Sequence, residues 1–408
     1  MSGIVVIGAG QAAGQAAASL RQEGYEGKVT ILGDEAQAPY QRPPLSKAYL
    51  SGEIGMDRVL VRPENFYPDK DIDLKTNTTV TAIDRDNKTV STESGDTYEY
   101  DKLLIATGSR PRILNIPGSD LEGIHYLRTI ADVDGIRGAM QSATRLCIVG
   151  GGYIGLEVAA VAKKAGLDVT VVEAMDRILQ RVTTPEMSEF YHNLHTGRGV
   201  NIMVNTGVDG FEGDNGSSSA EGSVTAVLCG DTKVEADLVI VGIGIIPNVE
   251  LAEAAGLECD NGIVVDDHCR TSDPDIYAAG DCTNHPNPIL DRRLRLESVP
   301  NAMGQARTAC SNMLGGDKVY SEVPWFWSDQ YELKLQMVGF SADGDSSVVR
   351  GDKDANQFAV FYLKDGKVVA VDAVNSPKEF MVCKQLYGKP ADAAALADPE
   401  TELKSLLG

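Results

Sequence analysis

The sequence lacks a basic excess and any long apolar run. Acidic residues outnumber basic ones by 59 to 37, which gives a formal net charge of −22. A nucleic-acid-binding protein needs basic side chains to neutralise phosphates, so this balance argues against that class. The longest strongly apolar run, 238–246, is well short of the roughly 18 residues that a membrane-spanning helix needs. With no signal-like basic and apolar regions at the N-terminus, we expect a cytoplasmic protein that does not bind membranes.

Paired cysteines and metal-ligand spacings are also missing. The seven cysteines are scattered singly and no C-x-x-C occurs, so neither a zinc site nor a thioredoxin-like dithiol is predicted. We expect them to be buried free thiols. The histidines show no ligand spacing either, and we expect no metal site and no role for them in the chemistry: His125, His192, His195, His268 and His285.

What the sequence does contain is the composition of a globular chain, with 43% hydrophobic and 24% charged residues. Its 408 residues suit two or three domains. Residue alternation predicts an antiparallel meander over 80–83, 88–92 and 97–100, and a serine-rich hairpin tip at 213–222. After about Tyr320 the pattern changes to a separate α+β tail, with strands at 347–350, 358–363 and 368–374.

The first motif with chemical meaning is Gly8-Ala9-Gly10-Gln11-Ala12-Ala13, a G-x-G-x-x-A. It follows an apolar strand at 4–7 and opens an Ala-rich helix at 11–22, before a second strand at 28–32. In this context the glycines allow a tight turn and a close approach to a pyrophosphate, and Ala13 allows close helix packing. Asp34 and Glu35 end the second strand, where a ribose hydroxyl is expected.

A complete G-x-G-x-x-G, Gly150-Gly151-Gly152-Tyr153-Ile154-Gly155, repeats this pattern. Glu173 ends the next strand, and a carboxylate there binds ribose hydroxyls and repels a 2′-phosphate. This favours NADH, although Arg177 is near enough to keep NADPH as an alternative. Two dinucleotide fingerprints in one chain indicate hydride transfer between a nicotinamide and a flavin, with FAD at the first site.

Further segments carry a family resemblance. Thr107-Gly108 and 276–281 (IYAAGD) resemble the remaining FAD fingerprints of glutathione-reductase-like flavoproteins. Within that superfamily, 43–50, 150–159, 297–302 and 324–331 are similar to the NADH-dependent ferredoxin reductases of oxygenase systems. The resemblance covers essentially the whole chain. It implies an α/β fold with two Rossmann-like domains, an NADH domain (111–243) inserted in an FAD domain (1–110 and 244–320), and a C-terminal α+β interface domain (321–408).

The resemblance also implies which residues contact the cofactors. Asp281 would bind the ribityl chain of the flavin, the alternative being an ordinary turn aspartate. The helix that begins at Val299 would direct its N-terminus at the negative charge of the reduced flavin, a contribution of about 0.3–2 kcal/mol. Beside the fingerprint residues, the implied cofactor contacts are Arg42, Lys47, Val80, Ala106, Thr107, Gly108, Arg128, Glu157, Gly242, Gly244, Gly280, Asp281, Glu297, Ser298, Val299 and Trp327.

Lys47 and Glu157 are the two residues expected to act in catalysis. Lys47 follows a rigid Pro-Pro and resembles the family lysine beside the flavin, which Glu157 approaches from the NADH domain. We expect the pair to orient the nicotinamide; the alternative is a solvated lysine and a surface glutamate. We expect no helix before Leu45 in this proline-rich stretch. No redox cysteine lies around 39–47, where the superfamily's disulfide reductases and peroxidases carry theirs, so electrons must leave to an outside acceptor.

The resemblance identifies that acceptor as an acidic [2Fe-2S] ferredoxin, which serves a haem-thiolate monooxygenase. An acidic partner requires a local basic patch on this acidic chain. Candidates are Arg62, Arg307 and Lys334, with Arg292, Arg293 and Arg295 as a second cluster. Trp325 and Trp327 would line the electron route or pack in the tail core. The alternatives are a rubredoxin reductase, a Rieske dioxygenase reductase and, from another class, a flavin-bearing redox sensor.

Overall fold

The structure is a computed structural model that describes residues 2–214 and 222–407. The chain divides into two compact units, each made of separate segments. The first unit comprises Met1–Arg42, Gly55–Arg110 and Ile245–Pro324, and the second comprises Pro43–Ile54, Pro111–Gly244 and Trp325–Gly408. Both units contain a parallel sheet of five strands, and the second also contains an antiparallel sheet of five strands. These sheets confirm the predicted α/β fold class with a C-terminal α+β part.

The first unit is built on a parallel sheet of order β19-β7-β1-β2-β3. Strands β1, β2, β7 and β19 are almost entirely buried, as is typical of a sheet covered on both faces. The strands are β1 (Ile4–Ile7), β2 (Val29–Leu32), β3 (Ile72–Lys75), β7 (Lys102–Ile105) and β19 (Ile276–Ala278).

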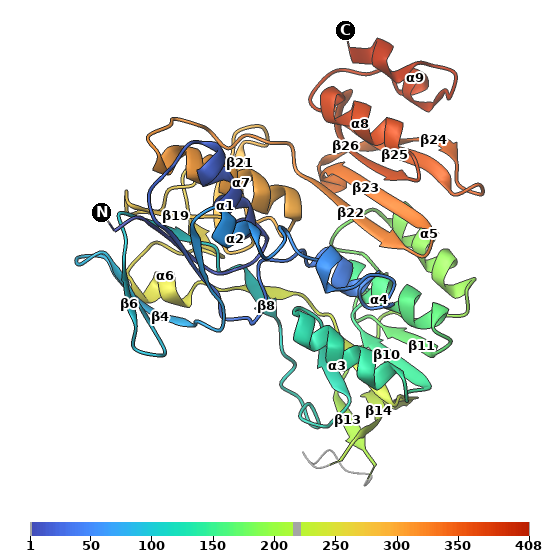
Figure 1. Cartoon of the computed structure of the whole chain (residues 1–408). Coiled ribbons are helices and arrows are strands. Elements are labelled where there is room, and N and C mark those ends of the chain that lie inside the picture. The colour runs from blue at the N-terminus through green and yellow to red at the C-terminus, as the bar shows by residue number, and fades with distance from the viewer. Residues whose placement is uncertain (1, 215–221, 408) are drawn as a thin grey trace. The chain divides into compact units, whose positions relative to one another are not determined.

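Two helices, α1 (Gln11–Gln22) and α7 (Val299–Met313), cover one face of this sheet and pack against each other (Figure 1). The buried residues of both helices are mostly small, such as Ala16 and Ala309, and Cys310 Sγ of α7 lies 3.6 Å from the Ala16 carbonyl oxygen of α1. The other face packs against the antiparallel meander β4 (Val80–Asp84), β5 (Thr89–Thr92) and β6 (Thr97–Glu99), which confirms that prediction. The smaller elements are η2 (Met56–Arg58), α2 (Phe66–Asp69), β8 (Ser109–Pro111), β17 (Ile245–Pro247), α6 (Glu250–Ala254), β18 (Ile263–Val264), β20 (Thr283–Asn287) and β21 (Arg292–Leu294).

The second unit repeats the first arrangement in a parallel sheet of order β12-β11-β10-β16-β9. Its strands are β9 (Ile124–Tyr126), β10 (Arg145–Val149), β11 (Asp168–Val172), β12 (Asn201–Met203) and β16 (Leu238–Val241). Its helices are α3 (Ile130–Met140), α4 (Tyr153–Lys164) and α5 (Pro185–Thr196), and β13 (Gly210–Gly213), β14 (Val224–Cys229) and β15 (Thr232–Glu235) form a small antiparallel sheet.

The C-terminal part of the second unit is an antiparallel sheet of order β22-β23-β26-β25-β24, with α8 beside β26 and β23 (Figure 1). The elements are β22 (Trp325–Gln330), β23 (Leu333–Gly339), η3 (Ser341–Asp343), β24 (Ser346–Asp352), β25 (Gln357–Lys364), β26 (Lys367–Val374), α8 (Pro377–Leu386), α9 (Ala393–Ala397) and η4 (Leu403–Leu407). Strands β22 and β23 were not predicted. Three adjacent aromatic residues open β22, and such a run shows no alternation from which to infer a strand.

A 3₁₀ turn, η1 (Pro43–Ser46), begins before Leu45, so the prediction of no helix there is wrong. Proline is accepted at the start of a helical turn because the amide it lacks would have no partner.

Strands β13 and β14 pair as the arms of the predicted hairpin, but most of its expected tip, 215–221, lies outside the described residues. Among the residues that are described, no helix has both the length and the apolar character to cross a bilayer.

Candidate functional site

The first glycine fingerprint forms an open cradle at the end of β1. Gly8 has a φ of +100°, and a Cβ there would lie 2.3 Å from the carbonyl oxygen of Ala106. A Cβ on Gly10, in contrast, would meet no atom within 4 Å. Gly10 is also the N-cap of α1, and no side chain caps this helix. The free amides and the open backbone therefore fit a pyrophosphate, while Ala12 and Ala13 are buried against the sheet.

The second fingerprint has the same geometry. Gly150 has a φ of +110°, and its Cβ would lie 2.4 Å from the carbonyl oxygen of Gly242. Gly152 is open like Gly10 and begins α4 without a side-chain cap. A Cβ on Gly155 would lie 2.3 Å from the Gly150 oxygen, so glycine is required where the helix meets the turn. The two turns are closed by the same kind of hydrogen bond. The Ala106 amide donates to the Ile7 carbonyl at 2.8 Å, and the Gly242 amide donates to the Val149 carbonyl at 2.8 Å.

Acidic residues stand beside both cradles. Glu35 accepts hydrogen bonds from Tyr40 Oη at 2.5 Å and Arg42 Nη2 at 2.8 Å, whereas Asp34 is exposed. Burial opposes the charge of Arg42, but Tyr40, Glu35 and Asp281 together raise its pKa. The Arg42 guanidinium therefore stays charged among the predicted FAD residues of the first unit.

Glu173 is held rigidly at the second cradle. Its Oε2 accepts the Gly151 amide at 2.7 Å and its Oε1 accepts the Met175 amide at 2.9 Å. Arg177 is engaged nearby: it donates to the carbonyl oxygens of Thr183 and Gln180 and to the Ser188 hydroxyl. An arginine bound in this way is not available for a 2′-phosphate, which supports NADH over NADPH.

Thr107 and Asp281 are each fixed by a residue that the sequence did not reveal. Thr107 Oγ1 donates to the Asn248 carbonyl at 2.7 Å, and the Asn248 side chain donates back to the Thr107 carbonyl at 2.9 Å. Ser109 donates to Asp281 Oδ2 at 2.9 Å. These bonds join segments more than a hundred residues apart in sequence, so no local pattern could have predicted them.

The start of α7 and the turn at Gly280 share a buried polar network. The helix begins at Val299, as predicted, with Ser298 as its N-cap accepting the Asn301 amide. The fully buried Gln305 accepts from the Gly280 amide at 2.8 Å and from Thr283 Oγ1 at 2.9 Å. Gln305 was missed because a glutamine in a helix carries no distinctive signal.

Two other predicted cofactor residues lie in the first unit. Val80 is buried on β4, and Glu297 is an exposed partner of Arg295.

The predicted catalytic pair lies within the second unit and is in contact. Lys47 Nζ is 2.7 Å from Glu157 Oε2, and the Glu157 residue is only 3% exposed. Two serines that the sequence analysis did not select complete the site: Ser46 donates to Glu157 Oε2 at 2.5 Å and Ser328 to Glu157 Oε1 at 2.7 Å. Glu157 is therefore a buried carboxylate with three donors, and the alternative of a surface glutamate is wrong.

The remaining predicted cofactor residues are distributed over the second unit. Tyr153 is bonded to the Met337 sulfur, and Ile154 is exposed. The Arg128 amide donates to Asp132, which forms a capping box with Thr129 at the start of α3. Gly244 has a φ of +108° and follows the turn at Gly242.

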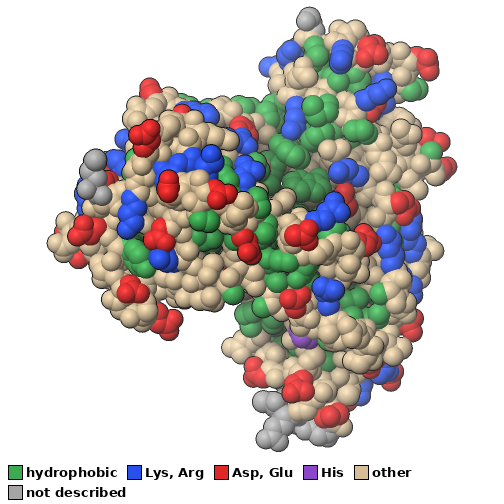
Figure 2. All heavy atoms as spheres, in the orientation of Figure 1, with side chains coloured by type: hydrophobic (Ala, Val, Ile, Leu, Met, Phe, Trp, Pro, Cys, Tyr) green, Lys and Arg blue, Asp and Glu red, His purple; other side chains and the backbone are tan. Residues whose placement is uncertain are grey.

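The tryptophans and basic residues proposed for a partner are partly accessible. The rings of Trp325 and Trp327 lie 5.6 Å apart, and Lys384 Nζ lies 3.9 Å from the Trp325 ring centroid. Arg307 and Lys334 are exposed, and Arg62 lies over the Phe66 ring. Acidic and basic side chains are interspersed over the face in Figure 2.

The second arginine cluster is largely engaged in internal bonds. Arg293 donates to the Val265 and Asn284 carbonyls, and Arg295 donates to Asn261 and Glu297. These two arginines stabilise the loops of the first unit, and the exposed Arg307 is the better candidate for a partner.

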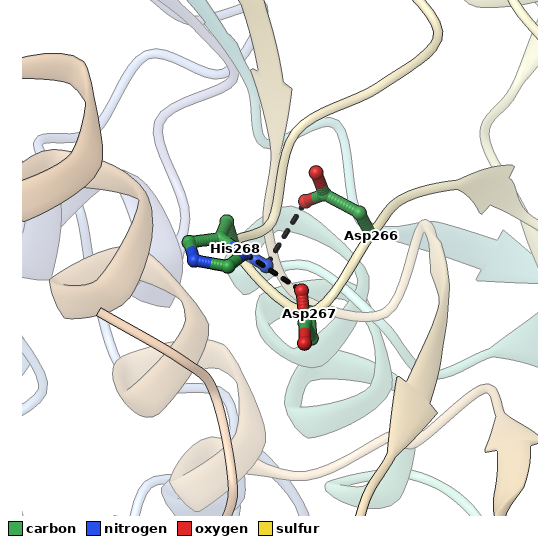
Figure 3. A group of neighbouring side chains, drawn as sticks. All are labelled: Asp266, Asp267 and His268. Carbon is green, nitrogen blue, oxygen red and sulfur yellow. Dashed lines mark hydrogen bonds and ion pairs between the residues drawn. The ribbon is translucent and has the colours of Figure 1, made fainter. Parts of the chain in front are cut away.

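A separate group of possible metal ligands, Asp266, Asp267 and His268, lies on the loop between β18 and β19 (Figure 3). Hydrogen bonds within the protein explain why these three side chains lie close together. Asp266 accepts the His268 and Arg270 amides, and the His268 ring bonds Asp267 at 2.6 Å and Asp317 at 2.9 Å. Partial burial opposes protonation of His268, but these two hydrogen bonds outweigh it and raise its pKa.

Comparison with known proteins identifies the family. Residues 2–306 match the family described as Pyridine nucleotide-disulphide oxidoreductase, and residues 325–407 match the one described as Reductase C-terminal. The chain belongs to the pyridine nucleotide-disulphide oxidoreductase family. Membership confirms the predicted oxidoreductase class and its cofactors, FAD and NADH. The predicted resemblance to oxygenase-linked reductases is also confirmed by the relatives below.

Rhodocoxin reductase of Rhodococcus erythropolis is 44% identical over 405 residues, which cover 98% of this chain and 93% of that protein. Putidaredoxin reductase of Pseudomonas putida is 45% identical over 410 residues, covering 99% and 96%. A crystal structure of a covalent putidaredoxin reductase–putidaredoxin complex matches with a TM-score of 0.94 and 44% identity, covering 99% of this chain and 98% of that one. A rubredoxin-NAD(+) reductase of Pseudomonas putida is 40% identical over 375 residues, covering 92% and 96%.

The family name refers to disulfides, but the cysteines of this chain form none. All seven cysteines lie among the described residues, and each is free. Burial raises the pKa of every one of these thiols, that of Cys259 to about 11, so none is a reactive thiolate. The prediction of buried free thiols is confirmed for six of the seven cysteines, whereas Cys259 is only half-buried.

Proposed function

We propose that this chain is an FAD-dependent NADH:ferredoxin reductase, which passes electrons from NADH through FAD to a [2Fe-2S] ferredoxin. The observation that carries the proposal is the duplicated cradle: two open glycines, Gly10 and Gly152, each begin an uncapped helix at the end of a buried strand. Two dinucleotide sites and no reactive thiol leave an external acceptor for the electrons. The relatives named for a rhodocoxin and a putidaredoxin support a ferredoxin in that place.

FAD, when bound, supplies the conversion of a two-electron hydride donor into two single-electron transfers. The protein's part is to bind and orient the cofactors. Glu173 would accept the ribose hydroxyls of NADH, and the buried Glu157 would hold the Lys47 ammonium beside the nicotinamide. The N-terminus of α7, with Ser298, would place positive helix dipole beside the flavin.

The other predicted cofactor residues belong to this proposal as well. We assign residues 1–110 and 244–320 to FAD binding, 111–243 to NADH binding and 321–408 to the partner interface. A haem-thiolate monooxygenase as the final electron acceptor and a cytoplasmic location are parts of the proposal that rest on the sequence.

Cytochrome c reduction tests the proposal. With NADH as donor, we expect slow reduction by the purified flavoprotein alone and a large increase on adding a [2Fe-2S] ferredoxin. A rate that does not depend on ferredoxin would contradict the proposal and favour a redox sensor with slow turnover.

A rubredoxin reductase is the second candidate, because one relative is a rubredoxin-NAD(+) reductase; the reductase of a Rieske dioxygenase is a third. Replacing the ferredoxin by rubredoxin in the same assay separates the first two. A higher specificity constant for rubredoxin would replace the ferredoxin assignment with the second candidate.

A further inference from the structure

Beyond the two residues of the predicted pair, Glu157 is the end point of a chain of hydrogen bonds through the second unit. Ser328 donates to Glu157 Oε1 at 2.7 Å, and Gln330 Nε2 donates to Ser328 Oγ at 3.2 Å. Gln330 Oε1 bonds His195 Nε2 at 2.8 Å, and His195 Nδ1 bonds Tyr331 Oη at 3.4 Å. Glu157, Ser328, Gln330 and His195 are all buried.

The chemistry of these groups gives the chain one direction. Because Gln330 uses its NH₂ group on Ser328, its carbonyl oxygen faces His195 and must accept a proton from Nε2. His195 Nδ1 is then the acceptor for the Tyr331 hydroxyl. Every donor points toward Glu157, so the dipoles add along the chain and end at the carboxylate.

The charge states of the two outer members agree with this direction. Burial lowers the pKa of His195 to about 4, and Arg198 and His192 oppose its protonation as well, although the bond to Gln330 favours it. The neutral ring therefore carries one proton, as the chain requires. Burial raises the pKa of Tyr331 to about 12 against the opposing charge of Arg198, so its hydroxyl remains a donor.

The outer end is fixed despite an unfavourable backbone. Tyr331 has a φ of +58°, a left-handed conformation that is rare for a bulky residue. Its ring lies 5.1 Å from the His195 ring and 4.2 Å from the Arg198 guanidinium carbon, and Arg198 is itself paired with Glu332. These contacts hold the tyrosine in a conformation that the turn alone would not favour.

We propose that Ser328, Gln330, His195 and Tyr331 are positioning residues, which orient the Glu157 carboxylate so that its Oε2 is presented to Lys47. The assignment rests on the proposed hydride-transfer function. Ser328 fixes Oε1, and Ser46 and Lys47 share Oε2, so the carboxylate cannot rotate. The chain orients and does not conduct protons, because the Gln330 amide does not readily release one.

The direction of the chain can be tested without turnover by NMR of protein labelled with ¹⁵N-histidine. At pH 7 and without NADH, we expect His195 to be neutral, with its proton on Nε2 and an unprotonated Nδ1. The Gln330→Met variant should shift the Nε2 resonance because its acceptor is gone. A proton on Nδ1, a charged ring, or unchanged shifts in Gln330→Met would each overturn the proposal.

The functional role is tested by stopped-flow reduction of bound FAD by NADH. Ser328→Ala and Gln330→Met should each slow reduction about tenfold, since the first removes a hydrogen bond to the Glu157 carboxylate and the second removes the bond that orients Ser328. The double variant should be no slower than Ser328→Ala alone, because the chain is already cut at its inner end. Multiplying losses, or wild-type rates in both single variants, would reject the positioning role.

Thr183→Ala is the matched control. It removes another buried hydroxyl of the same unit, one bonded to Asp372 at 2.6 Å and outside the chain, so it should lower stability and leave the reduction rate unchanged. A slowing equal to that of Ser328→Ala would count against the chain. If NADH does not reduce FAD even in the wild-type protein, the proposed function fails, while the histidine spectra still decide the direction of the chain.

Discussion

At the residue scale, the glycines of the two fingerprints fall into two groups. Gly8 and Gly150 are required by the fold, because a Cβ would meet a backbone carbonyl oxygen at 2.3 and 2.4 Å. Gly10 and Gly152 are not: their φ values of −96° and −81° suit any residue, and the space around them is open. Glycine is a good N-cap residue, and at these two open positions it also lets a ligand approach the backbone.

Valine at these open positions should separate folding from cofactor binding. For Gly10→Val we expect loss of FAD and a fall in the unfolding free energy of the apoprotein of no more than about 1 kcal/mol, because valine is a poorer N-cap residue than glycine. Gly8→Ala should cost about 1–3 kcal/mol through strain. Urea unfolding and the FAD content of the purified protein measure both effects. Gly152→Val should keep FAD and lose NADH affinity; stoichiometric FAD in Gly10→Val would contradict the first assignment.

Glu173 offers a second prediction at this scale. Its carboxylate is oriented by the Gly151 and Met175 amides, so Glu173→Gln should weaken NADH binding about tenfold through the loss of charged hydrogen bonds to the ribose. Affinity for NADPH should change much less, because the repulsion of its phosphate also disappears. Titration with each nucleotide is the measurement. Asp168→Asn, at the other end of β11, is the control, and equal losses for both nucleotides would refute the assignment.

At the scale of elements, a buried carboxylate joins the C-terminal sheet to the segment before α5. Asp372 lies on β26 and accepts hydrogen bonds from Thr183 at 2.6 Å and from Tyr362 on β25 at 3.0 Å. Burial raises its pKa to about 6, which the two hydrogen bonds only partly oppose. Because this pKa is above the unfolded value, protonated Asp372 favours the folded state. That contribution is complete below about pH 4 and is lost as pH rises through about 6.

Asp372→Asn should therefore remove part of the pH dependence of stability. At pH 8 we expect the variant to be more stable than wild type, by on the order of 3 kcal/mol at most, because a neutral amide replaces a buried charge. Near pH 4.5 the difference should be small. Urea unfolding across this range measures it, with the exposed Asp365→Asn as control. A stability difference that is constant with pH would show that Asp372 does not titrate as described.

At the scale of the whole molecule, the net charge of −22 would oppose the proposed ferredoxin at long range if that partner is acidic, as the sequence predicts. Association then depends on local basic residues, whose attraction is screened by salt. Arg307 is exposed on α7, the helix whose N-terminus is proposed to face the flavin. It is therefore the strongest single candidate for this contact.

Arg307→Glu should reduce the rate of ferredoxin reduction at low salt by about tenfold and abolish most of its salt dependence. Steady-state rates between low and high ionic strength are the measurement. Lys164→Glu makes the same change in net charge at the C-terminal end of α4, outside the residues assigned to the partner interface, and should behave like wild type. If the two variants respond alike, net charge rather than a patch at Arg307 governs association.

Local features of the fold were predictable from the sequence. The helix at 11–22 and the strand at 4–7 occupy the expected residues, because glycine, small-residue and apolar patterns are local signals. Strand β22 was missed because its aromatic run has no period. The contacts of Asn248, Gln305 and Ser328 were missed because their partners are distant in sequence.

The sequence by itself determined the two dinucleotide cradles, the absence of a reactive cysteine pair and the family, since each is written in short motifs. Only the tertiary structure decided which residues hold Glu157. Ser46, Lys47 and Ser328 come from segments more than a hundred residues away from it and converge on one carboxylate. Burial at 3% exposure then makes that carboxylate depend on its hydrogen bonds, because water cannot replace them.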